Sequence, residues 1–355
     1  MKTTNLLRVG IVVTDLDAAM DSYRRIHGIT DWDVSHIDAG QTSSAVSYGR
    51  TTSTTPGTWR AAIGTTRPAP SATGPGGGPS RPVTFELVEP TGGESPFNEY
   101  LLTKGPGICF IRVLATGGDD VAGHFDRLGI PAVYSADIDG SRRTFYDTRD
   151  ALGGFLVEMV TGAAEPATDA TDREPTSGVL PPLQGIHHFG VIVDNVLGSL
   201  EAYRDIFGIT RFECKTWQTG HGRLDDPRYR GEKVDHGYFT AQGSAGDFGF
   251  EIIQCKHGPS HYNREFSDIR GPGIHHMFSW MTTDEDEWRD TVAAMTGAGH
   301  GLCMGSPLRG HAAEFGYFDV FDELGGYLIE GVLRRRPPAP EHMRPDWVVD
   351  FGEQR

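Results

Sequence analysis

Four residues in the second half of the chain have side chains that could chelate a divalent metal. They are His188, Glu251, His276 and Glu330. Each occupies the same place in a repeated unit as a residue of the first half. These counterparts are Arg8, Glu86, Phe110 and Glu158. Imidazoles and carboxylates are ordinary ligands of divalent metals, whereas a guanidinium and a phenyl ring are not. The sequence therefore predicts one metal site per chain, in the second half.

The repeat that relates these residues covers most of the chain. Residues 9–30 read VGIVVTDLDAAMDSYRRIHGIT, and residues 189–210 read FGVIVDNVLGSLEAYRDIFGIT. Three later landmarks recur in the same order: FELVEP and FEIIQC, GPGI and GPGI, then LGGFLVE and LGGYLIE. Self-similarity of this kind is the signature of a duplicated structural unit.

The duplication predicts two domains. Residues 1–161 form the first copy and residues 184–333 the second. Residues 162–183 are rich in Pro, Ala, Thr and Asp, which is typical of a linker, and residues 334–355 form a Pro-rich, charged tail. The stretch 66–82 is rich in Gly and Pro, and we expect it to be an exposed loop within the first domain.

Each copy divides again into two modules. A module opens with a β-branched run, continues with a capping residue and an amphipathic stretch, and then contains short strand-like segments. After GPGI the scheme begins again. The pattern of one strand, one helix and three strands thus occurs four times. It predicts an α+β fold with eight strands per domain and the helices outside.

Strand alternation predicts which histidine of each tandem pair faces the site. Successive side chains of a strand point to opposite faces, so only one member of the pairs at 187–188 and 275–276 can face a concave surface. We expect the second member to face it and the first to lie on the other face. Glu251 and Glu330 lie in the apolar runs FGFEII and YLIEGV. A buried carboxylate is costly there unless it is paired or bound to a cation.

The segments HHFGVIVDNVLGSLEAYRDIFGI, FEIIQCKHGPS, GPGIHHMFSW and LGGYLIE together resemble the vicinal oxygen chelate superfamily. This superfamily includes glyoxalase I, methylmalonyl-CoA epimerase, extradiol dioxygenases and antibiotic-resistance proteins. The resemblance covers residues 6–161 and 184–333 and implies four βαβββ modules, paired into two cupped mixed sheets around a metal. It also implies that the first and last strands of each module supply the ligands. The match is closest to the epimerase and glyoxalase branch, where a fourth ligand lies at the position of Glu251.

Two carboxylates and two imidazoles suggest one six-coordinate ion, with two positions left for water or substrate. Zn, Ni, Co, Mn and Fe(II) can all occupy such a ligand set. A divalent ion polarises a carbonyl or stabilises an enolate, and Glu251 or Glu330 could then act as ligand or base. Further candidates for catalysis are His236, His311 and Tyr317.

Other charged residues and histidines have simpler interpretations. Glu86 and Glu158 in the first copy are expected to pair with Arg8, which would neutralise a disused site. The remaining histidines of the second copy lie in polar, Gly-rich segments and are expected to face solvent. These are His221, His257, His261 and His300.

Two classes of enzyme and one class of binding protein fit these features. The main hypothesis is Lewis-acid catalysis without redox, by epimerisation, isomerisation or lyase chemistry next to a carbonyl of a small oxygen-rich substrate. The first alternative is an Fe(II) extradiol-type ring-cleaving dioxygenase. The segment VFDELGGYLIE lacks the Tyr and Asp-Pro of extradiol enzymes, and Glu251 would fill a position that oxygen activation needs. The second alternative is a protein that sequesters a small molecule.

Composition narrows the partners and the location. The formal net charge of −16 argues against nucleic acid or an anionic membrane surface, because both require clustered Lys and Arg. The sequence contains no signal peptide and no apolar span of about twenty residues. Its four cysteines have no metal-ligand spacing, and so few thiols in a long chain favour a reducing compartment. We therefore expect a cytoplasmic protein that acts on a small molecule. The sequence leaves open whether it forms a homodimer.

Overall fold

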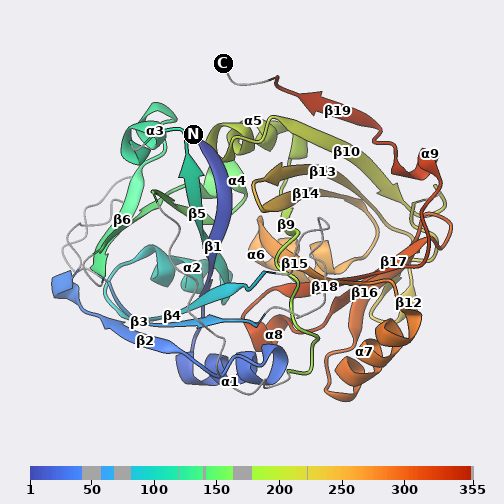
Figure 1. Cartoon of the computed structure of the whole chain (residues 1–355), viewed down its shortest axis with the longest axis horizontal. Coiled ribbons are helices and arrows are strands. Elements are labelled where there is room, and N and C mark those ends of the chain that lie inside the picture. The colour runs from blue at the N-terminus through green and yellow to red at the C-terminus, as the bar shows by residue number, and fades with distance from the viewer. Residues whose placement is uncertain are drawn as a thin grey trace.

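The computed structural model of the chain shows two curled β-sheets that lie side by side, one from each copy of the repeat (Figure 1). It describes residues 1–41, 57–67, 81–118, 120–138, 141–162, 178–221 and 223–352. Most of the expected linker at 162–183 and of the expected loop at 66–82 lies outside the described residues. None of the helices in the described residues is both long and apolar enough to cross a membrane.

The first sheet has eight strands in the order β2-β3-β4-β1-β5-β8-β7-β6. Their bounds are β1 (Lys2–Val12), β2 (Asp33–Ile37), β3 (Thr58–Thr65), β4 (Thr84–Gly92), β5 (Gly107–Thr116), β6 (Ala132–Ile138), β7 (Ser141–Tyr146) and β8 (Leu156–Thr161). β1 is parallel to β4 and β5 is parallel to β8, while β1 and β5 are antiparallel. Two four-stranded modules are thus joined through β1 and β5.

The second sheet repeats this arrangement and adds three strands. Its order is β12-β11-β16-β17-β18-β15-β9-β14-β13-β10-β19. The strands are β9 (His188–Ile192), β10 (Arg211–Gln218), β11 (Arg228–Tyr229), β12 (Glu232–Lys233), β13 (Gly237–Ala245), β14 (Phe248–His257), β15 (Gly273–Thr282), β16 (Leu302–Leu308), β17 (Ala313–Phe318), β18 (Leu328–Arg334) and β19 (Trp347–Asp350). The predicted α+β fold of paired modules in two cupped mixed sheets is confirmed. The second sheet has eleven strands rather than eight because β11, β12 and β19 join it.

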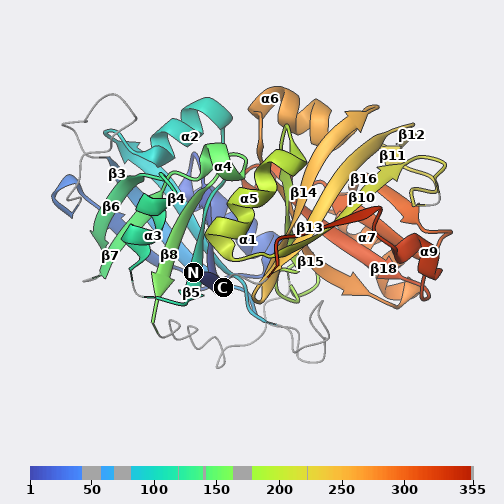
Figure 2. The same ribbon diagram turned by 90° about the horizontal axis from the view of Figure 1, so that it is seen from above.

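One helix of each module lies outside the cups (Figure 2). These helices are α1 (Leu16–His27), α3 (Val121–Arg127), α5 (Val196–Phe207) and α7 (Glu285–Gly297). The expected caps are present in the two equivalent helices α1 and α5. Asp15 Oδ1 accepts a hydrogen bond from Ala18 N at 2.9 Å, and Asn195 Oδ1 accepts one from Gly198 N at 3.1 Å.

Shorter helices close the two cups and connect the domains. Their bounds are η1 (Ala39–Gln41), α2 (Pro96–Lys104), α4 (Arg149–Leu152), a π-helix (Tyr262–Ser267), α6 (Asp268–Arg270), α8 (Phe321–Leu324) and α9 (Pro340–Met343). Phe97 and Tyr100 of α2 pack in the interior of the first cup. Tyr262 and Phe266 of the π-helix pack in the interior of the second cup. Each cup therefore has its own apolar interior.

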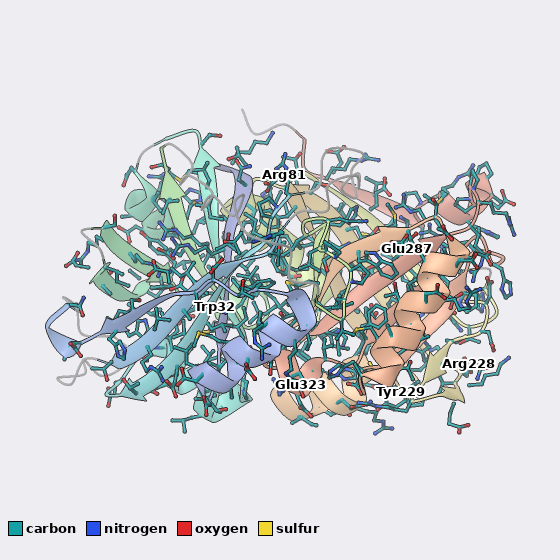
Figure 3. All side chains as sticks on the ribbon, turned by 60° about the horizontal axis from the view of Figure 1, so that its bottom comes forward. Trp32, Arg81, Arg228, Tyr229, Glu287 and Glu323 are labelled. Carbon is teal, nitrogen blue, oxygen red and sulfur yellow. The ribbon has the colours of Figure 1, made fainter. Side chains whose placement is uncertain are left out.

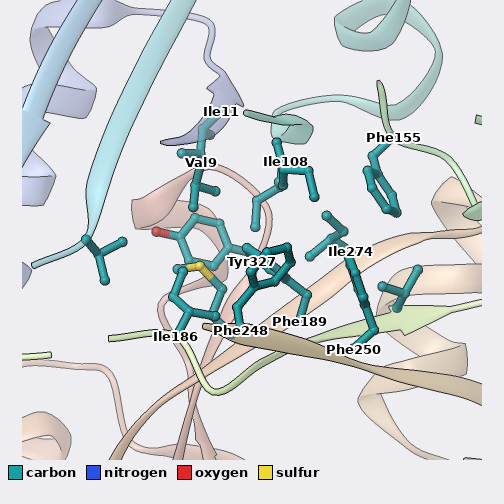
Figure 4. Packing of buried hydrophobic residues seen from close by; sticks show 14 of the residues in the cluster. Val9, Ile11, Ile108, Phe155, Ile186, Phe189, Phe248, Phe250, Ile274 and Tyr327 are labelled. Carbon is teal, nitrogen blue, oxygen red and sulfur yellow. The ribbon is translucent and has the colours of Figure 1, made fainter. Parts of the chain in front are cut away.

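A third and larger core joins the outer faces of the two sheets. Figure 4 shows Val9 and Ile108 of the first domain packed near Phe189 and Ile274 of the second. Polar contacts support the same junction. Glu323, which Figure 3 shows beside α1, accepts a hydrogen bond from Arg25 at 2.7 Å. The two domains are therefore one packed unit rather than two separate modules.

The segment that the sequence marks as a charged tail contains part of the second sheet. β19 pairs with β10, and Arg211 lies opposite Asp350 in the register. In Figure 1, β19 lies along the outer edge of β10. Residues 347–350 thus extend the sheet, and they contribute four residues to its edge.

Candidate metal centre

Four adjacent strands of the second sheet place one candidate ligand each inside the cup. His188 begins β9, Glu251 is on β14, His276 is on β15 and Glu330 is on β18. Glu251 and His276 both lie opposite Gly190 in the register of β9. A Cβ atom on Gly190 would lie only 1.9 Å from the His276 ring. The glycine therefore makes the space that this imidazole occupies.

The four side chains converge on one point. Glu330 Oε2 lies 3.3 Å from His188 Nε2 and 3.4 Å from His276 Nε2. Glu251 Oε2 lies slightly farther away, at 3.7 and 3.8 Å from the same nitrogens. At most 7% of any of these residues is exposed. The structure thus brings together all four residues that the repeat singled out.

The donor set fits a divalent metal. His188 Nε2, His276 Nε2 and Glu330 Oε2 are buried and have no hydrogen-bond partner. Buried polar atoms are nearly always satisfied, and a cluster of unsatisfied ones calls for a bound group. Nitrogen and carboxylate oxygen donors are the ligands that Zn, Mn, Ni, Co and Fe(II) accept in proteins. These residues could therefore hold one such ion.

The electrostatics of the cup also favour a cation. Burial raises the pKa of Glu330, but the two nearby imidazoles outweigh it and bring the pKa to about 2. Burial holds the pKa of Glu251 above its usual value, and the charge of Glu330 adds to this effect. Two carboxylates in one buried site repel each other, so a positive charge between them stabilises their ionised forms.

Gln242 positions the second carboxylate. Gln242 lies opposite Glu251 in the register of β13 and β14, and its Nε2 donates a hydrogen bond to Glu251 Oε1 at 3.0 Å. This bond leaves Oε2 directed at the two imidazoles. Gln242 was not singled out from the sequence, because an amide on a strand has no distinctive pattern.

His275 faces the interior of the cup, which corrects the expectation that it lies on the other face. The register of β15 shifts between Ile274 and His276, so His275 is the extra residue of a β-bulge. Its ring contacts Tyr262 at 4.9 Å and Tyr317 at 5.5 Å, both inside the cup. The bulge breaks the strict alternation on which the expectation depended.

A chain of imidazoles leads from the candidate ligand His276 to a carboxylate near the surface. The Nδ1 atoms of His276 and His275 are 3.0 Å apart, and His275 Nε2 and His261 Nδ1 share a hydrogen bond of 2.9 Å. His261 Nε2 lies 3.6 Å from Glu265 Oε2. A metal on His276 Nε2 requires the proton on Nδ1, and this fixes the tautomers of His275 and His261 in turn.

Two tyrosines adjoin the same ligand. The ring of Tyr317 lies 4.6 Å from that of His276, and its hydroxyl shares a hydrogen bond with the hydroxyl of Tyr262. Burial raises the pKa of both hydroxyls well above the usual value. Both groups therefore stay protonated near neutral pH and can donate hydrogen bonds. The sequence pointed to Tyr317 but not to Tyr262, which comes from the capping π-helix.

The other two histidines proposed for catalysis lie elsewhere. His236 is buried at the far end of β13, six residues before Gln242, which corresponds to roughly 20 Å along a strand. His311 is exposed in the turn between β16 and β17, with a φ of 58°. The structure therefore places neither histidine in the cluster of candidate ligands. Strand alternation indicates a face but not the distance along the strand.

Two histidines that were expected to face solvent are buried. His261 is fully buried and belongs to the imidazole chain, and His300 Nδ1 lies 3.2 Å from the carbonyl oxygen of Asp319. His221 and His257 are exposed, as expected. Polar neighbours in the sequence indicated solvent in all four cases, but the π-helix folds His261 back into the cup.

In the first cup an arginine occupies the place between the two carboxylates. Arg143 on β7 donates hydrogen bonds to Glu158 at 2.9 and 2.6 Å and to Glu86 at 2.5 and 3.0 Å. Arg8 lies 3.4 Å from Glu86, but the cation that bridges both carboxylates is Arg143. Burial alone would raise the pKa of Glu86, yet the charge of Arg143 holds it below its usual value. The expected neutralisation is present, with a different principal partner.

A cavity of about 770 Å³ lies at the junction of the two domains. Its lining includes Gln242 and Glu213 of the second domain together with Leu6 and Arg81 of the first. Of the four candidate ligands it includes His188 but not Glu251, His276 or Glu330. The cavity therefore adjoins one side of the candidate centre, and both domains contribute to it.

Comparisons with known proteins give one informative result. Neither a protein-family model nor a curated protein sequence matches the chain. Among solved structures, a mutant of 4-hydroxymandelate synthase from Streptomyces coelicolor is similar, with a TM-score of 0.58 and 14% sequence identity. The alignment covers 96% of this chain and 95% of that chain. The two proteins share a fold. This likeness spans both cups, and the paired βαβββ modules are those that the vicinal oxygen chelate resemblance implies.

The geometry predicts one tightly bound metal per chain. His276→Ala removes a central ligand and should reduce the bound metal from one equivalent to a small fraction, as measured by elemental analysis after dialysis. His311→Ala changes an exposed imidazole outside the cluster and should leave one equivalent bound. Two equivalents in the wild type, or full retention in His276→Ala, would contradict this assignment.

The imidazole chain should tune the affinity for that metal. His261→Phe removes the acceptor for His275 and should weaken metal binding by about tenfold or more, the usual effect of losing a group that orients a ligand. His261→Asn keeps an acceptor oxygen and should restore much of the affinity. Competition with a chromophoric chelator measures the metal affinity of both variants. Equal affinity in the two variants would show that His261 only fills space.

Arg143 should stabilise the first cup chiefly through charge. Arg143→Met removes the cation that bonds both buried carboxylates and leaves them only Arg8 and Arg112, at 3.4 and 3.5 Å. It should lower the free energy of unfolding by up to about 3–5 kcal/mol. The pKa of Glu86 is lowered by folding, so this stabilisation is present above the unfolded pKa and disappears as the pH falls through the folded pKa. Thermal unfolding against pH measures it. Adding Glu86→Gln and Glu158→Gln to Arg143→Met should recover stability, and a further loss would refute the charge argument.

Proposed function

We propose that the second cup is the active site of an enzyme that uses one divalent metal, held by two histidines and Glu330 with Glu251 as a more distant fourth group. The observation that carries this proposal is the convergence of three buried, unsatisfied donor atoms on one point. The first cup has Arg143 in the corresponding place, so we assign it no metal. The fold supports this division of roles, because both cups are built alike and differ in their side chains.

Oxygen-dependent chemistry with Fe(II) is the activity that we favour. Two histidines and one carboxylate form the ligand set typical of non-haem Fe(II) oxygenases. The solved structure that resembles this chain over nearly its whole length is named for its product, 4-hydroxymandelate, an aromatic 2-hydroxy acid. A benzylic hydroxyl is the kind of group that oxygen activation introduces. Fe(II) bound at this centre would supply that activation.

The position of Glu251 bears on the main objection to an oxygenase, because the donor atoms of His188, Glu251 and His276 all lie within 4.8 Å of one another. Glu251 Oε2 is 0.4 Å farther from each imidazole nitrogen than Glu330 Oε2 is, from 3.7 and 3.8 Å against 3.3 and 3.4 Å. Gln242 holds its other oxygen at 3.0 Å. We infer that Glu251 is held back by this hydrogen bond and leaves a position for substrate or oxygen. Tyr317 and Tyr262 share one hydrogen bond, so whichever hydroxyl accepts in it keeps a proton to donate beside that position.

Lewis-acid catalysis without redox stays the second candidate, and one observation favours it. Glu251 completes a set of four protein ligands of the glyoxalase and epimerase type, and burial raises its pKa. A carboxylate with a raised pKa is a better base for removing a proton next to a carbonyl. In this case Glu251 would be the catalytic base, and its charge would be essential.

Metal exchange and oxygen dependence separate the two candidates. Protein purified without oxygen and freed of metal should consume oxygen only after addition of Fe(II), in the presence of catechols or of aromatic 2-oxo acids, whose decarboxylation supplies the two electrons that hydroxylation by oxygen requires. Glu330→Gln should lose this uptake along with the metal, whereas Glu251→Gln should retain it. Turnover without oxygen after addition of Co, Mn or Ni, abolished in Glu251→Gln, would favour Lewis-acid catalysis instead.

A further inference from the structure

Arg309 is a half-buried cation without a carboxylate partner among the described residues. It follows β16 with a φ of 59°, and its guanidinium lies over the ring of Trp217 at 5.4 Å. Its Nε is buried without a hydrogen-bond partner, and its Nη1 donates to Met343 Sδ, a weak acceptor. A guanidinium has five N–H donors, so most of its capacity to bind an anion is unused.

Arg334 lies one strand away from Arg309, since Ala313 of β17 lies opposite both Leu308 and Arg334. Among the described residues no carboxylate forms an ion pair with it. It is the last residue of β18, four residues beyond Glu330, so strand alternation places both on the inner face of the cup. Burial lowers the pKa of Arg309, and the charges of Arg223 and Arg334 lower it further. The two cations therefore lie at the same edge of the second cup, although they repel each other. We call this edge, marked by Arg309 and Arg334, the rim.

Three neighbouring arginines, in contrast, pair with carboxylates. Arg223 pairs with Asp346 at 2.8 Å, Arg230 pairs with Glu265, and Arg335 pairs with Glu314 at 2.5 Å. The chain has 48 acidic and 32 basic residues, so carboxylates are plentiful. Two adjacent arginines without an acid among the described residues thus form a local positive site in an acidic protein.

A row of aromatic rings connects this rim with the candidate metal centre. Trp217 stacks on Tyr238 at 6.0 Å, Tyr238 contacts Tyr262 at 5.1 Å, and Tyr262 contacts Tyr317 at 5.8 Å. Tyr317 in turn contacts His276. The backbone of Arg334 is roughly 13 Å from that of Glu330, from four residues of strand.

We propose that Arg309 and Arg334 bind the carboxylate of an organic-acid substrate. The substrate has a flat, apolar body, and a pair of oxygens at its other end faces the metal. This inference rests on the proposed function. A carboxylate accepts paired, charge-assisted hydrogen bonds from a guanidinium, and it would satisfy the buried Nε of Arg309. Two ionised glutamates neutralise a divalent ion, so the rim arginines would supply the net attraction for an anion.

Binding of matched probes tests this subsite. Protein loaded with Co(II) is titrated with 3-(3,4-dihydroxyphenyl)propionate and with 4-propylcatechol, which has the same ring and chain without the charge, and the visible spectrum of cobalt reports binding. The wild type should bind the acid about tenfold or more tightly than the neutral probe. Arg309→Gln and Arg334→Gln together should abolish this preference without changing the affinity for 4-propylcatechol.

A control and a metal-free experiment separate this inference from the proposed function. Arg289→Gln changes an exposed arginine of α7 and should keep the preference. Loss of cobalt binding in the wild type would refute the proposed metal enzyme. In that case, stabilisation of metal-free protein by 3-phenylpropionate but not by 3-phenylpropanamide, lost in Arg309→Gln, would still support the anion site. A preference that persists in the double variant, or its absence in the wild type, would overturn it.

Discussion

The cost of burying two carboxylates inside an apolar cup is the constraint that governs both halves of this molecule. Each cup carries a glutamate on two equivalent strands, and ionised carboxylates in a dry site require a cation. The first cup supplies its own cation, because Arg143 bonds Glu86 and Glu158 at once. The second cup has two imidazoles, and Phe315 at the position equivalent to Arg143, so no arginine bridges its two glutamates and the proposed metal would take that place.

The backbone is nearly the same in the first and the second cup. Gly10 and Gly190 occupy equivalent places, and a Cβ on either would overlap the ring of Phe110 or His276. The equivalent strands β5 and β15 each have a register shift near their start, at Cys109 and His275. The scaffold therefore accommodates a ring pointing inward in both cups, and the side-chain type decides whether that ring packs or coordinates.

Much of this could be predicted from the sequence, because the repeat fixes which residues share a strand position. It placed the four candidate ligands on adjacent inner positions without any knowledge of contacts. Local irregularities could not be predicted from the repeat, since strand alternation does not show the bulge that turns His275 inward. Arg143 was missed because its counterpart is a phenylalanine, so the repeat gave it no significance. β19 was missed because four residues within a charged segment show no strand pattern.

The central claim is that one cup holds a metal and the other holds an arginine in its place. Anomalous diffraction at the absorption edge of the bound metal tests it most directly, in crystals of protein loaded with Fe(II) or Co(II). The account predicts one peak, about 2.0–2.2 Å from His188 Nε2 and His276 Nε2, as is usual for metal–imidazole bonds. A peak between Glu86 and Glu158, or no peak beside the two histidines, would contradict it.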